Sequence, residues 1–379
     1  MKIMISAGEA SGDRLGAGLA RALRARAPSV ELIGMGGDEM AEAGVRLLQH
    51  ASEVAVVGIV EVIRHLPAVR RAMGRLEAAL AGERPDLLVP IDFPDFNLRL
   101  AAQSRRAGIP VVYYVSPQVW AWRKGRVRTM RAIVRRVLVL FPFEKAFYDA
   151  AGVAATFVGH PAAASRSRAS RFSLLPALGL DPGRRVLALL PGSRVGEAGR
   201  LFPIQLEAAR RLREDEPGLQ LVVPRARTIP RGFLEGIARD RGVAGLAICD
   251  GPYPDLLEAA DAGIVASGTA TLDAALAGLP FVAVYRMQPL SYLVARALVR
   301  VDHVALPNLV AGRRIVPELV QGECDPASIA REVAPLLRDP ERAARMREAL
   351  GGVRSRLVGD GAFDRAAEAV LAELGRKQV

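Results

Sequence analysis

The sequence predicts an α/β fold made of two doubly wound domains and a helical C-terminal tail. Short β-branched runs alternate with amphipathic helical patterns in both halves of the chain, and a polar stretch at 162–171 separates the halves. This alternation is typical of parallel sheets that carry helices on both faces. At 379 residues the chain is too long for one hydrophobic core, which also favours two domains.

The individual elements follow this rhythm along the chain. In the first domain we expect buried strands at 2–7, 30–35, 87–91, 111–115, 137–141 and 156–159. The helices between them include 15–26, 96–108 and a basic helix at 123–136. In the second domain we expect strands at 186–190, 219–223, 246–249, 263–266 and 281–285, each followed by a turn and a helix. From residue 325 onward only helical patterns remain. In such an architecture, ligands are expected in the cleft between the two domains.

The charge balance is the unusual feature of the composition. The formal net charge is +12 and the sequence pI is about 10.5. An excess of this size indicates a phosphate-rich ligand, a polyanion or an anionic membrane surface. The two cysteines, Cys249 and Cys324, form no metal or disulfide framework, which suits a reducing compartment. The N-terminal segment lacks the features of a signal peptide, and no stretch approaches the ~20 apolar residues of a membrane-spanning helix.

Carboxylates follow two of the predicted strands in the first domain. Asp92 ends the strand at 87–91, where neighbouring phenylalanines should exclude part of the water from it. A carboxylate in that position is suited to accept a proton from a substrate hydroxyl, although this stretch alone leaves a structural role equally open. Asp95 is expected to cap the next helix. Glu9 follows the first strand and should project into the cleft.

The first strand–helix turn, AGEASGD at 7–13, stands where a dinucleotide-binding loop would stand. Its glycines, Gly8 and Gly12, do not form the GxGxxG pattern, so a Rossmann dehydrogenase is disfavoured. The plainer interpretation is a tight turn in which Asp13 caps the helix.

Two loops of the second domain are suited to phosphate. Both follow a strand and open a helix, where backbone N–H groups and the helix dipole favour anions. The first contains Gly192, Ser193 and Arg194, and the second is SGTATLD at 267–273. Together, in a basic protein, they indicate a nucleotide diphosphate. Neither is a Walker loop, and no DxD motif occurs in the chain, so we expect neither ATP hydrolysis nor a metal ion or other cofactor.

Both tryptophans of the chain, Trp120 and Trp122, lie in one run, YVSPQVWAW, between a strand and the basic helix. By itself such a run is more simply a packing corner. Apolar residues also recur at helical spacing among arginines earlier in the chain, at Ile59, Val62, Ile63 and Leu66. A basic amphipathic segment of this kind suits an anionic membrane interface, and a surface helix packed on the sheet is an almost equal alternative.

The motifs taken together resemble those of one family. They are AGEASGD (7–13), GIVEV (58–62), IDFPDFN (91–97), YVSPQVWAWR (114–123), PFEKAFYD (142–149), VGHP (158–161), LPGSR (190–194), SGTATLD (267–273) and LPNLVAGR (306–313). In this order and spacing they are similar to the lipid-A-disaccharide synthases, glycosyltransferase family 19. The resemblance implies the GT-B fold, two Rossmann-type domains that face each other across a cleft.

The resemblance also implies a reaction. The family joins UDP-2,3-diacylglucosamine to 2,3-diacylglucosamine 1-phosphate, releases UDP and makes a β(1→6) linkage with inversion. By the matching motifs Asp92 takes the role of the general base, with Glu9 close by. The residues implied for UDP and phosphate are Ser193, Arg194, Ser267, Gly268, Thr269, Thr271, Asp273 and Asn308. Acyl or membrane contact is implied for the apolar segment at 59–66 and for Trp120 and Trp122.

Two departures from the family pattern affect the expected site. The second loop ends in Asp273 where the family usually has Glu, so a contact with a ribose hydroxyl would need adjustment or a water molecule. Alanines at 162–164 follow VGHP where the family commonly has Leu and then Asp. His160 within that motif is as consistent with a structural role as with substrate contact.

The architecture sets the expected boundaries and partners. Since the last helix of GT-B proteins often crosses back, we assign 1–165 and the helix at 360–379 to the acceptor-side domain, and 172–350 to the UDP-sugar-binding domain. We expect a cytoplasmic protein attached peripherally to the inner membrane through anionic phospholipid, and a homodimer is left open.

Two rival functions remain open from the sequence. A UDP-GlcNAc 2-epimerase-like enzyme would share the fold, but it would not need the tryptophan run or the apolar basic segment. A nucleic-acid-binding module would explain the charge, but the arginines lie along helices without interleaved aromatic residues and no recognition motif is present, so we expect no nucleic acid partner.

Overall fold

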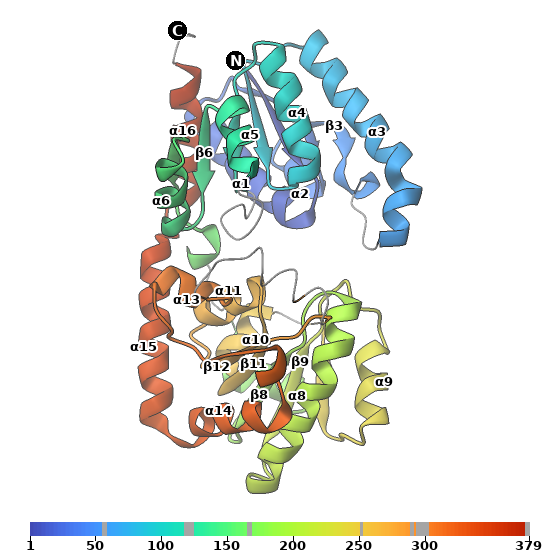
Figure 1. Cartoon of the computed structure of the whole chain (residues 1–379), viewed down its shortest axis with the longest axis vertical. Coiled ribbons are helices and arrows are strands. Elements are labelled where there is room, and N and C mark those ends of the chain that lie inside the picture. The colour runs from blue at the N-terminus through green and yellow to red at the C-terminus, as the bar shows by residue number, and fades with distance from the viewer. Residues whose placement is uncertain are drawn as a thin grey trace. The chain divides into compact units, whose positions relative to one another are not determined.

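The computed structural model of the chain describes residues 1–54, 59–116, 125–164, 169–250, 253–288, 292 and 303–375, and for residues 59–66, 125 and 126 it describes the backbone alone. These residues divide into two compact units (Figure 1). The first comprises Met1–Pro161 and Asp360–Val379, and the second comprises Ala162–Gly359. The predicted first domain ended at 165 and the predicted second domain at 350, so the units divide a few residues away from those positions.

The first unit is built on a seven-stranded parallel sheet. Its strands are β1 (Lys2–Ala7), β2 (Glu31–Gly36), β3 (Arg46–His50), β4 (Leu87–Ile91), β5 (Val112–Tyr114), β6 (Arg136–Val139) and β7 (Ala155–Phe157), in the spatial order β3-β2-β1-β4-β5-β6-β7. Its helices are α1 (Ala10–Arg26), α2 (Asp38–Glu42), α3 (Ile59–Gly82), α4 (Pro94–Arg106), α5 (Gly125–Ile133), α6 (Pro142–Ala150) and α16 (Ala362–Leu374). One core cluster joins a face of the sheet to α1 and α16, and another joins the other face to α3, α4 and α5, so helices cover both faces.

The second unit repeats the plan with a six-stranded parallel sheet. Its strands are β8 (Val186–Leu190), β9 (Gln220–Pro224), β10 (Leu246–Cys249), β11 (Ala262–Ala266), β12 (Phe281–Tyr285) and β13 (Glu318–Val320), in the order β10-β9-β8-β11-β12-β13. Its helices are α7 (Arg171–Ala177), α8 (Val195–Asp215), α9 (Phe233–Asp240), α10 (Tyr253–Ala259), α11 (Thr269–Leu276), α13 (Leu306–Ala311), α14 (Pro326–Arg338) and α15 (Pro340–Leu357). The strands β8 and β11 are buried throughout, as expected for a parallel sheet enclosed by helices.

The strand order reverses between β1 and β4 in the first unit and between β8 and β11 in the second. An amide side chain bridges the strands at each of these points. Asn97 Nδ2 donates to the carbonyl oxygens of Ser6 and Ile91, both at 3.1 Å. Gln205 Nε2 donates to the carbonyl oxygens of Leu190 at 3.1 Å and Ile264 at 3.2 Å. These amides satisfy buried backbone acceptors at the edge where doubly wound folds bind their ligands.

The C-terminal helix α16 packs on the first unit. Its Phe363 lies so close to α1 that a Cβ atom on Gly18 would come within 2.3 Å of the phenyl ring. At the other end, Arg136 Nε lies 2.7 Å from Glu373 Oε1, and the Glu373 side chain is 1 % exposed. Arg365 Nε donates to the carbonyl oxygen of Val158 at 2.9 Å. The tail is therefore fixed by a close helix contact, a buried ion pair and a bond to the backbone beyond β7.

Three element predictions need correction. The edge strands β3 and β13 were not predicted, because they are short and their side chains are mostly only half-buried, so neither has a strong apolar run. The basic helix predicted at 123–136 ends at Ile133, and Arg136 already belongs to β6.

Among the described residues, no helix combines the length and apolar character needed to cross a bilayer.

Candidate active site

Asp92 lies in a strained turn directly after β4. Its φ is 45° and that of Phe93 is 48°, both in the left-handed region that residues other than glycine rarely adopt. Tyr113 Oη donates to the Asp92 carbonyl oxygen at 2.7 Å, and Asn97 Nδ2 donates to the same oxygen at 2.8 Å. The Asp92 N–H donates to the carbonyl oxygen of Tyr114 at 3.2 Å. Backbone strain of this kind persists only where the surroundings enforce it, and such positions cluster at functional sites.

The environment of Asp92 favours a proton on its carboxyl group. Burial and the negative charge of Glu9 raise the pKa of Asp92, the N–H of Phe93 partly opposes them, and the net effect is a rise from 3.8 to about 6. A carboxyl group with a pKa of this kind can exchange a proton with a substrate near neutral pH.

Glu9 reaches the same edge because the backbone at Gly8 lies close to the ring of Phe93. A Cβ atom on Gly8 would lie 2.3 Å from the ring of Phe93, so only glycine lets the β1–α1 loop approach the turn after β4. Glu9 is the exposed N-cap residue of α1, and its side chain makes no capping hydrogen bond. The structure thus brings together the two carboxylates that the sequence placed at this edge.

The two predicted helix caps of this unit are wrong. The helix α4 begins at Pro94, with Phe93 as its N-cap residue, so Asp95 lies in the first turn. A proline is favoured at that first position because it needs no hydrogen-bond acceptor for an N–H group. Asp13 lies inside α1 and caps another helix, since its carboxylate accepts from the N–H groups of Gly37, Glu39 and Met40 at 2.6 to 3.1 Å, at the start of α2.

In the second unit, the loop after β8 already holds an anion from its own chain. Gly192 has a φ of 105°, and Ser193 and Arg194 are exposed. The Glu197 carboxylate accepts hydrogen bonds from the N–H groups of Ser193 and Arg194. The Thr228 hydroxyl donates to the carbonyl oxygen of Ser193. A carboxylate of the protein itself therefore lies at the loop that the sequence predicts for phosphate.

In the loop after β11, some polar side chains form hydrogen bonds within the protein, and other residues are exposed. Ser267 Oγ donates to the carbonyl oxygen of Val304 at 2.9 Å. Thr271 is buried, and its hydroxyl donates to the Gly268 carbonyl oxygen at 2.7 Å. Gly268 and Thr269 are exposed at the start of α11. The backbone and hydroxyl groups at those two positions are the ones that a ligand can reach.

Asp273, the last residue of that motif, has a protein partner. Tyr253, at the start of α10, donates its phenolic hydrogen to the Asp273 carboxylate. Burial and the Asp273 charge raise the pKa of the phenol, so the proton stays on Tyr253. The shorter carboxylate is therefore held by a phenol group that sequence reasoning did not predict.

Asn308 is buried and uses all four of its hydrogen-bonding positions within the protein. Nδ2 donates to the Val316 carbonyl oxygen at 3.0 Å and to Glu318 Oε1 at 2.7 Å. Oδ1 accepts from the N–H groups of Ile315 at 2.7 Å and Val316 at 3.0 Å. Two donors and two acceptors are the full capacity of an amide side chain, so Asn308 acts on this edge by fixing the segments around it.

Glu318 extends that network toward the loop after β11. Its carboxylate accepts from the N–H groups of Val304 at 3.2 Å and Ala305 at 3.0 Å, just before α13. The Val304 carbonyl oxygen in turn accepts from Ser267. One chain of hydrogen bonds therefore connects Asn308 to the phosphate-type loop.

The whole chain matches one protein family. A family model described as lipid-A-disaccharide synthetase matches residues 3–363. A lipid-A-disaccharide synthase from Geobacter sulfurreducens is 46% identical over 377 residues, which are 99% of this chain and 98% of that protein. Another from Myxococcus xanthus is 46% identical over 373 residues, 98% of this chain and 97% of that protein. The chain belongs to the lipid-A-disaccharide synthase family. It is accordingly a glycosyltransferase of lipid A biosynthesis.

Solved structures of other proteins share the fold of this synthase. A calicheamicin glycosyltransferase matches with a TM-score of 0.61 and 20% identity, covering 100% of this chain and 99% of the other. A UDP-GlcNAc 2-epimerase from Neisseria meningitidis matches with a TM-score of 0.68 and 11% identity, covering 98% of this chain and 100% of the other. Identities this low show the GT-B fold alone, so they do not favour the epimerase alternative.

Several residues predicted for this synthase lie outside the described parts of the chain. Trp120 and Trp122 belong to the segment 117–124. Ile59, Val62, Ile63 and Leu66 lie on α3, whose backbone is described there without side chains. His160 is described, and its ring lies tilted by 41° against that of Phe141 with ring centroids 5.5 Å apart. Burial lowers the pKa of His160 to about 4, so its ring is neutral at physiological pH.

Sequence reasoning missed the residues that support the predicted ones. Tyr113 and Asn97 hold the Asp92 turn, Tyr253 holds Asp273, and Glu318 holds Asn308. Asn97 and Tyr113 stood inside or beside quoted motifs, so their buried polar groups were a usable signal. The signals for Tyr253 and Glu318 were weaker, because Tyr253 is separated from Asp273 by a strand and Glu318 belongs to a strand that was not predicted.

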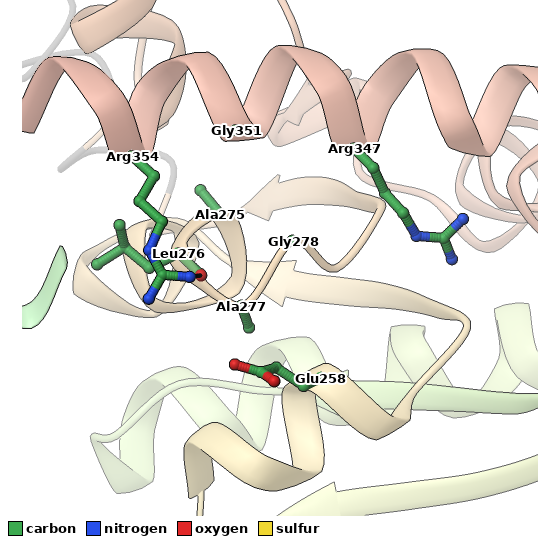
Figure 2. A pocket seen from close by; sticks show the side chains of 8 residues that line it. All are labelled: Glu258, Ala275, Leu276, Ala277, Gly278, Arg347, Gly351 and Arg354. Carbon is green, nitrogen blue, oxygen red and sulfur yellow. Dashed lines mark hydrogen bonds between the residues drawn. The ribbon is translucent and has the colours of Figure 1, made fainter. Parts of the chain in front are cut away.

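A separate pocket of about 390 Å³ lies elsewhere in the second unit (Figure 2). It is lined by Glu258, Ala275, Leu276, Ala277, Gly278, Arg347, Gly351 and Arg354. Because Gly278 follows the C-terminal end of α11, the pocket lies away from the strand ends that carry the two loops. Arg354 extends from α15 toward Leu276 and donates to its carbonyl oxygen at 2.9 Å. None of the predicted site residues lines this pocket.

Proposed function

We propose that the protein transfers the diacylglucosaminyl group of UDP-2,3-diacylglucosamine to 2,3-diacylglucosamine 1-phosphate, with inversion, to give the β(1→6) disaccharide 1-phosphate and UDP. The observation that carries this proposal is the Asp92 carboxyl group, held in a strained turn at the end of β4 with a pKa raised to about 6. Membership of the synthase family supplies the class of reaction.

Asp92 acts as the general base. Its ionised carboxylate takes the proton of the acceptor's 6′-hydroxyl as that oxygen attacks the anomeric carbon of the donor. The new C–O bond forms as the bond from the anomeric carbon to the diphosphate oxygen breaks, and UDP leaves with the electron pair. Glu9 stands beside the base, and its negative charge makes Asp92 a stronger proton acceptor.

The two loops of the second unit receive the departing UDP. Negative charge grows on the diphosphate as the bond breaks, and preorganised N–H groups at helix starts stabilise such charge. The proposed donors are the N–H groups of residues 193, 194, 268 and 269, the hydroxyls of Ser193 and Thr269, and the Arg194 guanidinium. A cation on this loop provides the neutralisation that a metal ion provides in other glycosyltransferases.

A product assay tests this proposal. The protein is incubated with both acylated glucosamine substrates, and the products are measured by mass spectrometry. We expect the disaccharide 1-phosphate and UDP in equal amounts, and the same rate in the presence of EDTA. Conversion of UDP-GlcNAc alone to UDP-ManNAc, with no disaccharide formed, contradicts the proposal. Complete loss of activity in EDTA, restored by one divalent ion, contradicts the metal-independent step.

We also propose that the N-terminal part of α3 attaches the protein to an anionic membrane surface. The later part of α3 packs on the sheet through Ala72, Leu76 and Leu80, while Arg70 and Arg71 are exposed. A helix that is basic on its outer side and apolar toward its start suits an interfacial position. The acylated substrates give such a position a use, since their chains remain in the membrane.

Vesicle flotation tests the attachment. The double substitution Ile63→Ser and Leu66→Ser should reduce binding to vesicles that contain anionic phospholipid by about thirtyfold or more, since each lost apolar side chain contributes about 1 kcal/mol or more. Phe172→Ser is the matched control, because Phe172 is 74% exposed in the second unit. Equal binding of the double variant and the parent protein would rule out this segment.

A further inference from the structure

The side chain of Glu197 covers the loop that joins β8 to α8. Glu197 is the third residue of α8, and Arg194 is the N-cap residue. A Cβ atom on Gly192 would lie 2.2 Å from Glu197 Oε2, so the carboxylate rests directly on the glycine backbone. It accepts hydrogen bonds from the N–H groups of Ser193 and Arg194. This arrangement is half of a capping box, in which the third helical residue bonds back to the N-cap.

The charges around this carboxylate are those of an anion site. Arg194 and Arg200 stabilise its ionised form, while burial acts in the opposite direction and raises the pKa of Glu197 overall. Tyr285, at the end of β12, which is separated from β8 by β11, also feels the charges of Glu197, Arg194 and Arg200. A carboxylate thus occupies the N–H groups and the arginine environment that a phosphate would use.

We propose that Glu197 is an internal competitor of the donor's diphosphate, which occupies the N–H groups of residues 193 and 194 in the empty protein and leaves them when UDP binds. The inference rests on the proposed function of this loop as a diphosphate site. Two anions cannot accept from the same two N–H groups at hydrogen-bonding distance, and they repel each other when close. Competition keeps the empty loop ordered and weakens the hold on the product UDP.

Isothermal titration of UDP into the parent protein and into Glu197→Gln tests this competition. Glutamine keeps a side-chain oxygen that can accept from the loop and is also favoured at this capping position, so the loop and helix should form normally. Loss of the negative charge should tighten UDP binding by about tenfold, because one repulsion between the carboxylate and the diphosphate is removed. Uridine, which lacks the diphosphate, should bind both proteins equally.

Glu214→Gln is the matched control, since Glu214 lies on the same helix and is paired with Arg210 at 2.6 Å near its far end. Its affinity for UDP should equal that of the parent protein. Glu197→Ala gives a second variant that removes the competing side chain completely, and it too should bind UDP more tightly, whatever its melting temperature.

The outcomes separate this inference from the proposed function. If the parent protein binds UDP but both Glu197 variants bind it equally or more weakly, Glu197 is a capping residue only and the competition is overturned. If the parent protein and all variants fail to bind UDP, the donor site itself is wrong, and the inference is overturned together with it.

Discussion

Asp92→Asn is expected to lower kcat by about 10²–10⁴-fold, because asparagine preserves the size and polarity of the side chain but cannot take a proton from the acceptor hydroxyl. The affinity for UDP should stay nearly unchanged, since the proposed UDP loops belong to the other unit. The measurement is a steady-state rate with both acylated substrates, together with a UDP titration. Asp95→Asn is the matched control, because Asp95 is exposed in the first turn of α4, and it should keep most of the activity.

The same carboxyl group sets the pH dependence of the reaction. Since the pKa of Asp92 is raised to about 6, the base is protonated and inactive below that pH, and the rate should rise as the pH increases through 6. A variant that removes the neighbouring charge, Glu9→Gln, should shift this rise to lower pH. A rate that is flat between pH 5 and 8, or an Asp92→Asn variant that is nearly as active as the parent, contradicts the assignment of the base.

Asp92→Asn should also change the stability of the protein, with a sign that depends on pH. The folded-state pKa of about 6 lies above the value of about 4 for an unfolded aspartate. Between those values the unfolded chain ionises more readily, so the stability falls as the pH rises and stays reduced above pH 6. The substitution removes that cost, which is about 3 kcal/mol for a difference of two pKa units, and should raise the melting temperature at pH 8 but not at pH 4.

Asn308→Asp is the second substitution with a large expected effect. It replaces the Nδ2 donor, which lies 2.7 Å from Glu318 Oε1, with an oxygen that carries negative charge. The Val316 carbonyl oxygen then loses a donor, and two carboxylates face each other where Asn308 is buried. Breaking a buried hydrogen-bonded network at one partner costs on the order of 3–5 kcal/mol. We expect a large loss of melting temperature and of activity.

A second substitution separates charge repulsion from other causes. The double variant Asn308→Asp and Glu318→Gln again has one carboxylate and one amide at this contact. The carboxylate is now at position 308 and the amide at position 318. Glutamine can still accept from the N–H groups of Val304 and Ala305, as Glu318 does at 3.2 Å and 3.0 Å. The double variant should therefore recover part of the lost stability in thermal unfolding. A double variant less stable than the sum of the two single effects contradicts the proposed network.

The alternation of strands and helices was enough to predict both sheets, because buried parallel strands are nearly continuous apolar runs. The strands β1, β4, β8, β10 and β12 begin and end at the predicted residues. The edge strands β3 and β13 were missed because they carry no such run, and their place depends on hydrogen bonds to a neighbouring strand. Local pattern therefore predicts the strands that are apolar runs, the edge strand β10 included, and misses strands that are not.

At the candidate site, the sequence predicted which residues gather at the strand ends but not what each one contacts. The proximity of Glu9 to Asp92 follows from parallel strands that end at one edge. The four hydrogen bonds of Asn308 and the phenol partner of Asp273 depend on which way each side chain points, and no spacing rule contains that information. Motif matching identifies Asn308 as important and gives no means to tell a ligand contact from a supporting one.

The amide bridges at the two points of strand reversal have a consequence for what each edge can bind. Asn97 and Gln205 donate to carbonyl oxygens that would otherwise lie open at the floor of the edge. With those acceptors satisfied, the loop after β8 offers the exposed Arg194 side chain and the N–H groups of Ser193 and Arg194, which the Glu197 carboxylate covers. A sugar hydroxyl finds few free acceptors on such a floor, whereas a phosphate finds donors. In the second unit the Gln205 bridge thereby favours anionic ligands at the strand ends, whereas in the first unit the carboxylates of Asp92 and Glu9 supply acceptors at the edge that Asn97 bridges.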